Sequence, residues 1–213
     1  MKNIIIIAVF SITSLLMMSV SCVEHEVVPP PNNDIDLNAH FEAYVNGTQV
    51  EMTQNVSGYT GSASNASIIN ASPIASQMVY AAQMTSFQQT KAIEVKLGAL
   101  NWDAAVDIEP TKSMFADFHN GSANSNVLFS DQALNGFEVK YTDDAGMEWL
   151  SMQNSNSAQS VNFSNISQAS DNHGDYSRFE CNFSCYVYKV DVQSGNVDSL
   201  QIQSGKFNGW FIR

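Results

Sequence analysis

The stretch Gly136–Met152, GFEVKYTDDAGMEWLSM, contains the clearest structural signal in the sequence. Apolar and polar residues alternate over 137–141, residues 143–146 (DDAG) are typical of a turn, and a second segment returns over 147–152. Apolar residues at every second position line one face of a β-strand, and Asp and Gly favour turns. The stretch therefore predicts an antiparallel hairpin with one apolar face.

Similar patterns occur along the rest of the chain. Asn46-Gly47 lies between two short alternating segments, and Asn-Gly is the strongest short signal for a hairpin. Residues 55–76 are rich in Ser, Asn and Gly and give only a weak pattern. The segments predicted as strands are 41–45, 49–53, 78–84, 92–100, 137–141, 147–152, 160–166, 178–192 and 199–212.

One segment has a helical period instead. In residues 111–119 (TKSMFADFH), Met114, Phe115 and Phe118 lie on one face of a helix, which predicts a short helix or helical turn there. Many short strands with turns between them and one short helix indicate an all-β fold, an antiparallel β-sandwich or a barrel. We favour the sandwich, formed by a single domain over residues 38–213.

Two cysteines share a face of one predicted strand. Alternation over 179–187 (FECNFSCYV) places Cys181 and Cys185 among the apolar residues. Four strand residues separate their Cα atoms by about 13 Å, whereas a disulfide needs about 7 Å or less. Both are expected to be buried free thiols, although a bulge between them leaves a disulfide open.

The N-terminal segment, residues 1–21, has the pattern of a signal peptide. Lys2 precedes the apolar run IIIIAVFSITSLLMMSV (4–20), and small residues lead to Cys22. An uncleaved transmembrane helix is the alternative, but the run is at the short limit for spanning a bilayer. Residues 22–37 then contain two early acids and three prolines, which predict an extended tether.

The small residues before Cys22 resemble the bacterial lipobox, in which this cysteine carries acyl chains, although Ser19 stands where Leu is usual. Two or three acyl chains are sufficient for stable anchoring. The resemblance implies a palmitate-type lipid on Cys22 that attaches the protein to the bacterial outer membrane. Glu24 and Glu26 resemble an export signal that favours the cell surface over the periplasmic side. Ordinary secretion with a free Cys22 thiol is the alternative.

The chain is strongly acidic. It has 9 basic and 21 acidic residues, a net charge of −12, and loss of Lys2 with the signal peptide makes this −13. Such a charge repels phosphate backbones and anionic headgroups. Nucleic acid is therefore not an expected partner, and contact with the membrane is expected through the lipid.

No catalytic pattern stands out. The sequence has no G-x-S-x-G elbow and no phosphate loop, and His40, His119 and His173 are expected on the surface or in loops. Asp143 and Asp144 are interpreted as turn residues and not as a catalytic pair. Residues 171–175 (DNHGD) are interpreted as a polar loop, because they lack the ligand spacing of an EF-hand. We therefore expect no enzymatic activity, no metal and no cofactor.

Two residues are weak candidates for a site. Trp102, followed by Asp103 at a strand end, is a candidate aromatic for stacking against a ligand. Asp198-Ser199-Leu200 resembles an acceptor for O-glycosylation in exported Bacteroidota proteins, which would modify Ser199.

Three segments together resemble a known group of proteins: Phe41–Gly47 (FEAYVNG), Gly136–Trp149 and Ser204–Phe207 (SGKF). They are similar to uncharacterised single-domain Bacteroidota lipoproteins thought to be β-sandwiches. The resemblance implies architecture and location but no activity.

The sequence thus predicts a lipid-anchored envelope protein with a non-enzymatic binding or structural domain. The alternative is a surface glycan-binding lipoprotein of a polysaccharide-uptake system. A hydrolase acting on glycans is the third reading, and it would require two carboxylates in a cleft.

Overall fold

A computed structural model describes residues 34–123, 125–130, 134–153, 159–190 and 195–213. Its elements are β1 (His40–Val45), β2 (Thr48–Thr53), β3 (Tyr59–Ile68), β4 (Ser76–Ser86), β5 (Ala92–Trp102), α2 (Lys112–Ser122), β6 (Gly136–Thr142), β7 (Glu148–Ser151), β8 (Ser160–Ser170), β9 (Asp175–Val190) and β10 (Val197–Ile212).

The strands form one antiparallel sheet. Its order is β2-β1-β10-β9-β7-β6-β5-β4-β3, and β8 pairs with β9 beside this path. One edge of β9 therefore has two partners, β8 along residues 175–184 and β7 at 187–188. The expected all-β antiparallel class with one short helix is confirmed.

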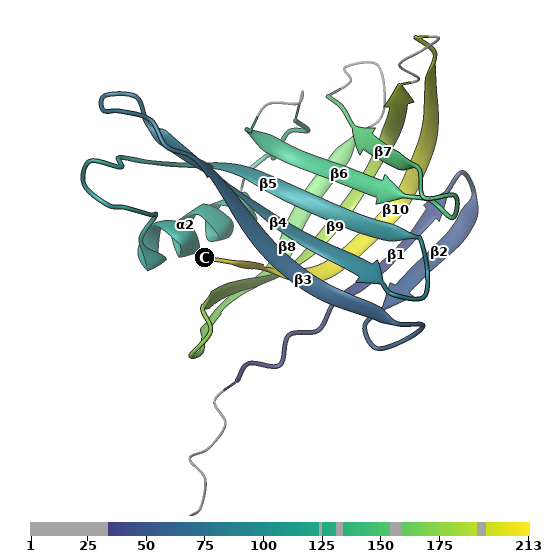
Figure 1. Cartoon of the computed structure of the whole chain (residues 1–213), viewed down its shortest axis with the longest axis horizontal. Helices are drawn as coiled ribbons and strands as arrows, with labels where there is room; N and C mark the ends of the chain where they lie inside the picture. The colour runs from purple at the N-terminus through teal and green to yellow at the C-terminus, as the bar shows by residue number, and fades with distance from the viewer. Residues whose placement is uncertain (1–33, 124, 131–133, 154–158, 191–194) are drawn as a thin grey trace, which may run out of the picture. The chain divides into compact units, whose positions relative to one another are not determined.

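The sheet curls strongly, so that β3 and β4 lie across the core from β9 and β10 (Figure 1). The crossing is tight at Gly61 in β3, where a methyl group would lie 2.6 Å from Ala39 Cβ and 2.7 Å from Trp210 Cη2. Beyond it, the Asn65 amide donates to the Ile212 carbonyl at 3.2 Å. The two facing layers are thus the two ends of a single sheet.

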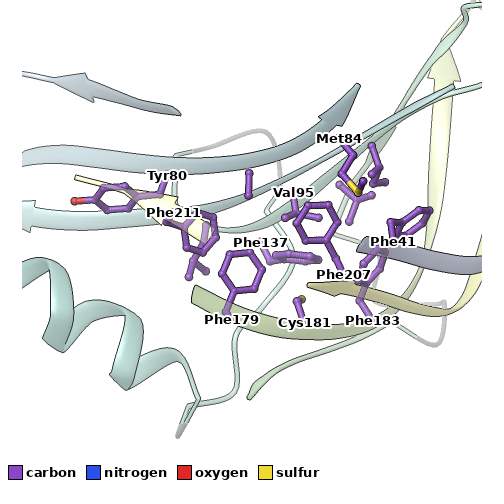
Figure 2. Packing of buried hydrophobic residues seen from close by; sticks show 14 of the residues in the cluster. Phe41, Tyr80, Met84, Val95, Phe137, Phe179, Cys181, Phe183, Phe207 and Phe211 are labelled. Carbon is purple, nitrogen blue, oxygen red and sulfur yellow. The ribbon is translucent and has the colours of Figure 1, made fainter. Parts of the chain in front are cut away.

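The space between these layers is filled mainly by aromatic rings (Figure 2). Phe179 and Phe211 stack with centroids 4.4 Å apart, and Phe137 meets Phe183 edge-on at 5.6 Å. Full burial of such a side chain stabilises a fold by about 1.5–3 kcal/mol. The alternating apolar face predicted from the sequence is this core.

The predicted hairpins are confirmed. Asn46 (φ 47°) and Gly47 (φ 79°) both have positive φ between β1 and β2, as a type I′ turn requires. Asp143 closes the β6–β7 turn, where its Oδ1 accepts from the Ala145 and Met147 amides at 2.9 Å.

Strand β3 was not predicted. Its residues 64–68 (SNASI) are all exposed, so no face of this half is selected for apolar side chains. Along its whole length β3 pairs with β4 alone among the strands described. It is therefore held by its backbone ladder rather than by alternating burial.

Helix α2 confirms the helical prediction for residues 111–119. Thr111 caps it, since its Oγ1 accepts from the Met114 amide at 3.3 Å. Phe115 is 1 % exposed and packs inward. In the part of the chain that the structure describes, no helix combines the length and apolarity needed to cross a bilayer.

The two cysteines of β9 are also as predicted. Cys181 and Cys185 are buried free thiols on the core face. Burial raises the pKa of Cys185 to about 12 and the pKa of Cys181 well above its usual value. Neither group is therefore a reactive thiolate.

The segment that leads into β1 is fixed to the domain. The Ile35 amide donates to Asp171 Oδ2 at 3.2 Å, in the turn between β8 and β9. The Gln54 side chain accepts from the Ala39 amide and donates to the Leu37 carbonyl, at 2.9 and 3.0 Å. Both contacts come before the first strand.

Candidate functional site

The outer face of β1, β10, β9 and β8 carries a polar hollow. Because core residues alternate with outward ones along these strands, the polar side chains gather on the side away from the core. A groove of about 450 Å³ lies there. It is lined by Glu42, Ser160, Val161, Asn162, Asn182, Phe183, Ser184, Ser204, Gly205 and Lys206.

Strand register arranges four of these residues in a row. Glu42 is opposite Lys206, Lys206 is opposite Asn182, and Asn182 is opposite Asn162. Three strand spacings of about 4.8 Å give the row a length of about 14 Å. We call these four residues the polar row; it crosses the strands and does not run along them.

A bulge in β10 forms part of the groove lining. The register with β9 shifts between Ile202 and Gly205, and Ser204 has a φ of 51°. The Ser204 amide therefore points away from the regular ladder and donates to Ser184 Oγ at 3.2 Å. Gly205 faces the core, where a methyl group would lie 3.0 Å from the buried Phe183 ring.

Carboxylates surround the single cation among the lining residues. Lys206 Nζ lies 3.7 Å from Glu180 Oε2, beside the groove. The Asn182 amide donates to Glu180 Oε1 at 3.1 Å. The hydrogen bond from Asn182, followed by the charge of Lys206, holds the pKa of Glu180 below its ordinary value, so Glu180 is ionised at neutral pH.

Tyrosines extend this outer face. Tyr44, two residues from Glu42 on β1, is 48 % exposed. Tyr186 and Tyr188 follow Ser184 on the same side of β9, with ring centroids 6.5 Å apart. A row of hydrogen-bonding side chains with aromatic rings nearby can bind a ligand that has both hydroxyl groups and flat apolar faces.

A second hollow, of about 700 Å³, lies between Val106 and Arg213. Its cations are already paired, since Arg213 contacts Asp175 and Glu109 at 2.8 Å and Lys112 contacts Asp175 at 3.0 Å. These pairs fix the end of β10 to the start of α2. We therefore assign this cluster to structure and take the outer groove as the candidate binding site.

The structure corrects the expectation for Trp102. This residue is 3 % exposed, and its indole Nε1 donates to the Asp107 carbonyl at 3.0 Å. The ring supports the loop after β5 from beneath and has no open face for a ligand. The following Asp103 suggested exposure, but the turn at 103–106 brings the chain back over the ring.

The structure places Ser199 in β10, where it is exposed and opposite Tyr188. It thus lies in a strand, on the outer face that also carries the groove. Cys22 and the whole of residues 1–33 lie outside the described residues, so the lipid anchor and most of the tether remain sequence predictions.

The expectation for His119 was wrong. It lies on the buried face of α2 and is 1 % exposed, and its Nδ1 donates to the Phe115 carbonyl at 2.9 Å. The rings of Tyr80 and Phe211 lie against it, with centroids 4.8 and 4.9 Å away. Burial lowers the pKa of His119 to about 3, so the ring is neutral. By contrast, His173 is exposed in a loop as expected.

The acidic loops have structural roles. Asp171 accepts from the amides of Ile35, His173 and Gly174 and from the Tyr176 hydroxyl. Across the ranges that the structure describes, no three His, Cys, Asp or Glu side chains gather as a metal site would require.

Sequence reasoning missed the groove because its residues are far apart in the chain. Glu42, Asn162, Asn182 and Lys206 become neighbours only through strand pairing. Each occupies an ordinary outward position in an alternating strand. Glycine inside a strand commonly marks a bulge or a close backbone approach, and Gly205 lies at the bulge in β10.

We compared the chain with protein-family models, with curated proteins and with solved structures, and none of these comparisons gives a match. The groove must therefore be interpreted from its own chemistry.

Proposed function

We propose that this chain is a lipid-anchored protein of the bacterial outer membrane whose domain binds a ligand in the outer groove without transforming it. The polar row is the observation that carries the binding role. The signal-like segment and Cys22 support the anchor, and the acids Glu24 and Glu26 favour the cell surface. The net charge of −12 argues against nucleic acid as the ligand.

A glycan is the ligand class that the groove favours. Asn amides both donate and accept hydrogen bonds, and Ser hydroxyls do the same, so together they match the alternating roles of sugar hydroxyls. Tyr44 supplies an exposed ring for the flat face of a sugar. A protein partner would more commonly need an apolar centre than a row of amides and hydroxyls.

Of the carboxylates beside Lys206, Glu42 lines the groove, whereas Glu180 lies at its border and is held by Lys206 and Asn182. Glycoside hydrolysis uses two carboxyl groups placed on either side of the scissile bond. This composition supports the binding role over the hydrolase reading.

The anchor is tested by metabolic labelling with palmitate of the wild-type protein and Cys22→Ala, followed by protease treatment of intact cells. We expect label only in the wild type and digestion of the domain in intact cells. Equal labelling of the mutant would refute lipidation at Cys22, and protection from protease would refute surface display.

The binding role is tested by native gel electrophoresis of the full chain in detergent, through gels that contain individual polysaccharides. We expect at least one polysaccharide to retard the protein and the double substitution Asn162→Ala, Asn182→Ala to abolish the retardation. Asn101→Ala is the matched control, since Asn101 is an exposed strand residue remote from the groove. Absence of retardation by every polysaccharide would refute glycan binding.

A further inference from the structure

The charges around the groove restrict the class of glycan. On β1, Glu42 is opposite Glu51 of β2, and Glu180 borders the far side of Lys206. Glu42 and Glu180 therefore lie on either side of Lys206, the one ammonium group of the groove, and Glu51 adds a negative charge one strand beyond Glu42. Because Lys206 is already 3.7 Å from Glu180, an anionic ligand would have to compete with a fixed carboxylate for it.

The whole chain strengthens this local bias. Its net charge is −12, so an acidic polymer that approaches the outer face meets repulsion before any contact forms. The remaining polar side chains of the lining are uncharged, namely Ser160, Asn162, Asn182, Ser184 and Ser204. Their dipoles bind hydroxyls without requiring a charge on the ligand.

The geometry also gives the ligand a direction. The polar row crosses β1, β10, β9 and β8, and Tyr44 lies beside its β1 end, about 7 Å along the strand from Glu42. Asn162 occupies the other end, and its side chain is exposed. A chain of sugars laid across the strands would meet an aromatic face at one end and an exposed amide at the other.

We propose that the groove selects an uncharged glycan chain laid across β1, β10, β9 and β8, with one sugar ring stacked on Tyr44, and that it rejects glycans carrying uronate, sulfate or phosphate groups. This inference rests on the proposed glycan-binding function.

Matched pairs of polysaccharides that differ in charge test the selection: dextran with dextran sulfate, and fully methyl-esterified polygalacturonate with polygalacturonate. In the same gels we expect a neutral member to retard the full chain and its charged counterpart to bind at least about tenfold more weakly. Equal or tighter binding of the charged counterpart would overturn the inference while leaving glycan binding in place. If no polysaccharide of any kind binds, the proposed function itself fails.

Salt and one substitution complete the test. Binding of an uncharged ligand is not screened, so its dissociation constant should change by less than about twofold between 0.05 and 0.5 M NaCl. Tyr44→Ala should weaken binding by about tenfold through loss of the stacked ring, whereas Phe87→Ala, an equally large change at an 82 % exposed ring elsewhere, should not. A strong salt dependence, or equal effects of the two substitutions, would contradict the proposal.

Discussion

At the scale of single residues, the buried polar groups determine how the fold responds to solution conditions. His119 and Tyr80 lie side by side in the aromatic core, and Tyr80 is 0 % exposed. Burial raises the pKa of Tyr80 above its ordinary value and lowers that of His119 to about 3. The folded state therefore keeps both groups neutral over the physiological range.

His119 should make the fold sensitive to mild acid. Its pKa falls from 6.5 to about 3 on folding, so below pH 6.5 the unfolded chain binds a proton that the folded chain excludes. The free energy of unfolding should thus decrease by about 1.4 kcal/mol per pH unit as the pH falls from 6.5 towards 3. Urea unfolding at several pH values measures this slope.

Two substitutions separate this effect from other acid effects. His119→Gln should flatten the slope between pH 6.5 and 4, whereas His173→Gln, at an exposed histidine, should leave it unchanged. Asp175 acts at lower pH, since its hydrogen bond from Ser170 and its contacts with Lys112 and Arg213 lower its pKa to about 2. An unchanged slope in His119→Gln would show that His119 is accessible to protons in the folded state.

The cysteines allow a second test at this scale. Cys181 and Cys185 are buried and their pKa values are raised, so a thiol reagent at pH 8 should not modify them within the time that modifies an exposed cysteine. Both should react in 6 M guanidinium chloride. Ser184→Cys, on the opposite face of the same strand, is the control and should react in the folded protein. Rapid modification of Cys181 or Cys185 in the folded protein, located by peptide mass spectrometry, would contradict the packing of β9.

At the scale of elements, a strand could be predicted from the sequence where one of its faces is buried. Strands with one buried face, such as β6 (Gly136–Thr142), display alternation and were predicted. Strand β3 has an exposed half and displays none, and His119 was misplaced because a polar residue on a short helix is ordinarily exposed. The groove could not be predicted at all, since pairing β1 with β10 joins residues that are more than 150 positions apart, as Glu42 and Lys206 show.

The crossing of β3 over β10 should tolerate no added side chain. Gly61→Ala should lower the free energy of unfolding by about 1–3 kcal/mol, because the new methyl group overlaps Ala39 and Trp210. Gly121→Ala is the matched control, since a methyl group there meets open space in α2 and should leave stability unchanged or raise it by up to about 1 kcal/mol. Denaturant unfolding measures both, and equal effects would contradict the tight crossing.

At the scale of the whole molecule, two features have opposite effects on self-association. The exposed half of β3, residues 64–68, favours pairing with another copy of the chain, and the net charge opposes it. Residues 64–68 (SNASI) contain no charge and no proline, the two features that commonly protect an edge strand from pairing with another chain. The net charge of −12 keeps copies of the protein apart instead.

Salt should therefore promote association through β3. Raising NaCl from 0.05 to 1 M shortens the Debye length from roughly 14 Å to about 3 Å, which should shift the protein towards dimers in sedimentation velocity experiments. Ala66→Lys places a charge in the middle of the exposed half of β3 and should prevent this shift, whereas Asn101→Lys should not. A salt-independent monomer would show that the edge is protected by other means.

The contacts before β1 have a mechanical consequence. A force applied at the N-terminal end would act first on the hydrogen bond between Ile35 and Asp171. It would then act on the two hydrogen bonds that the Gln54 side chain makes with Leu37 and Ala39. Behind them, β1 is bonded along both edges, to β2 and to β10, so that the load would act along the strand and strain its backbone bonds together. Under such a load the side-chain contacts before β1 would break before the strand pairs of β1, so the sheet that carries the groove would keep its shape.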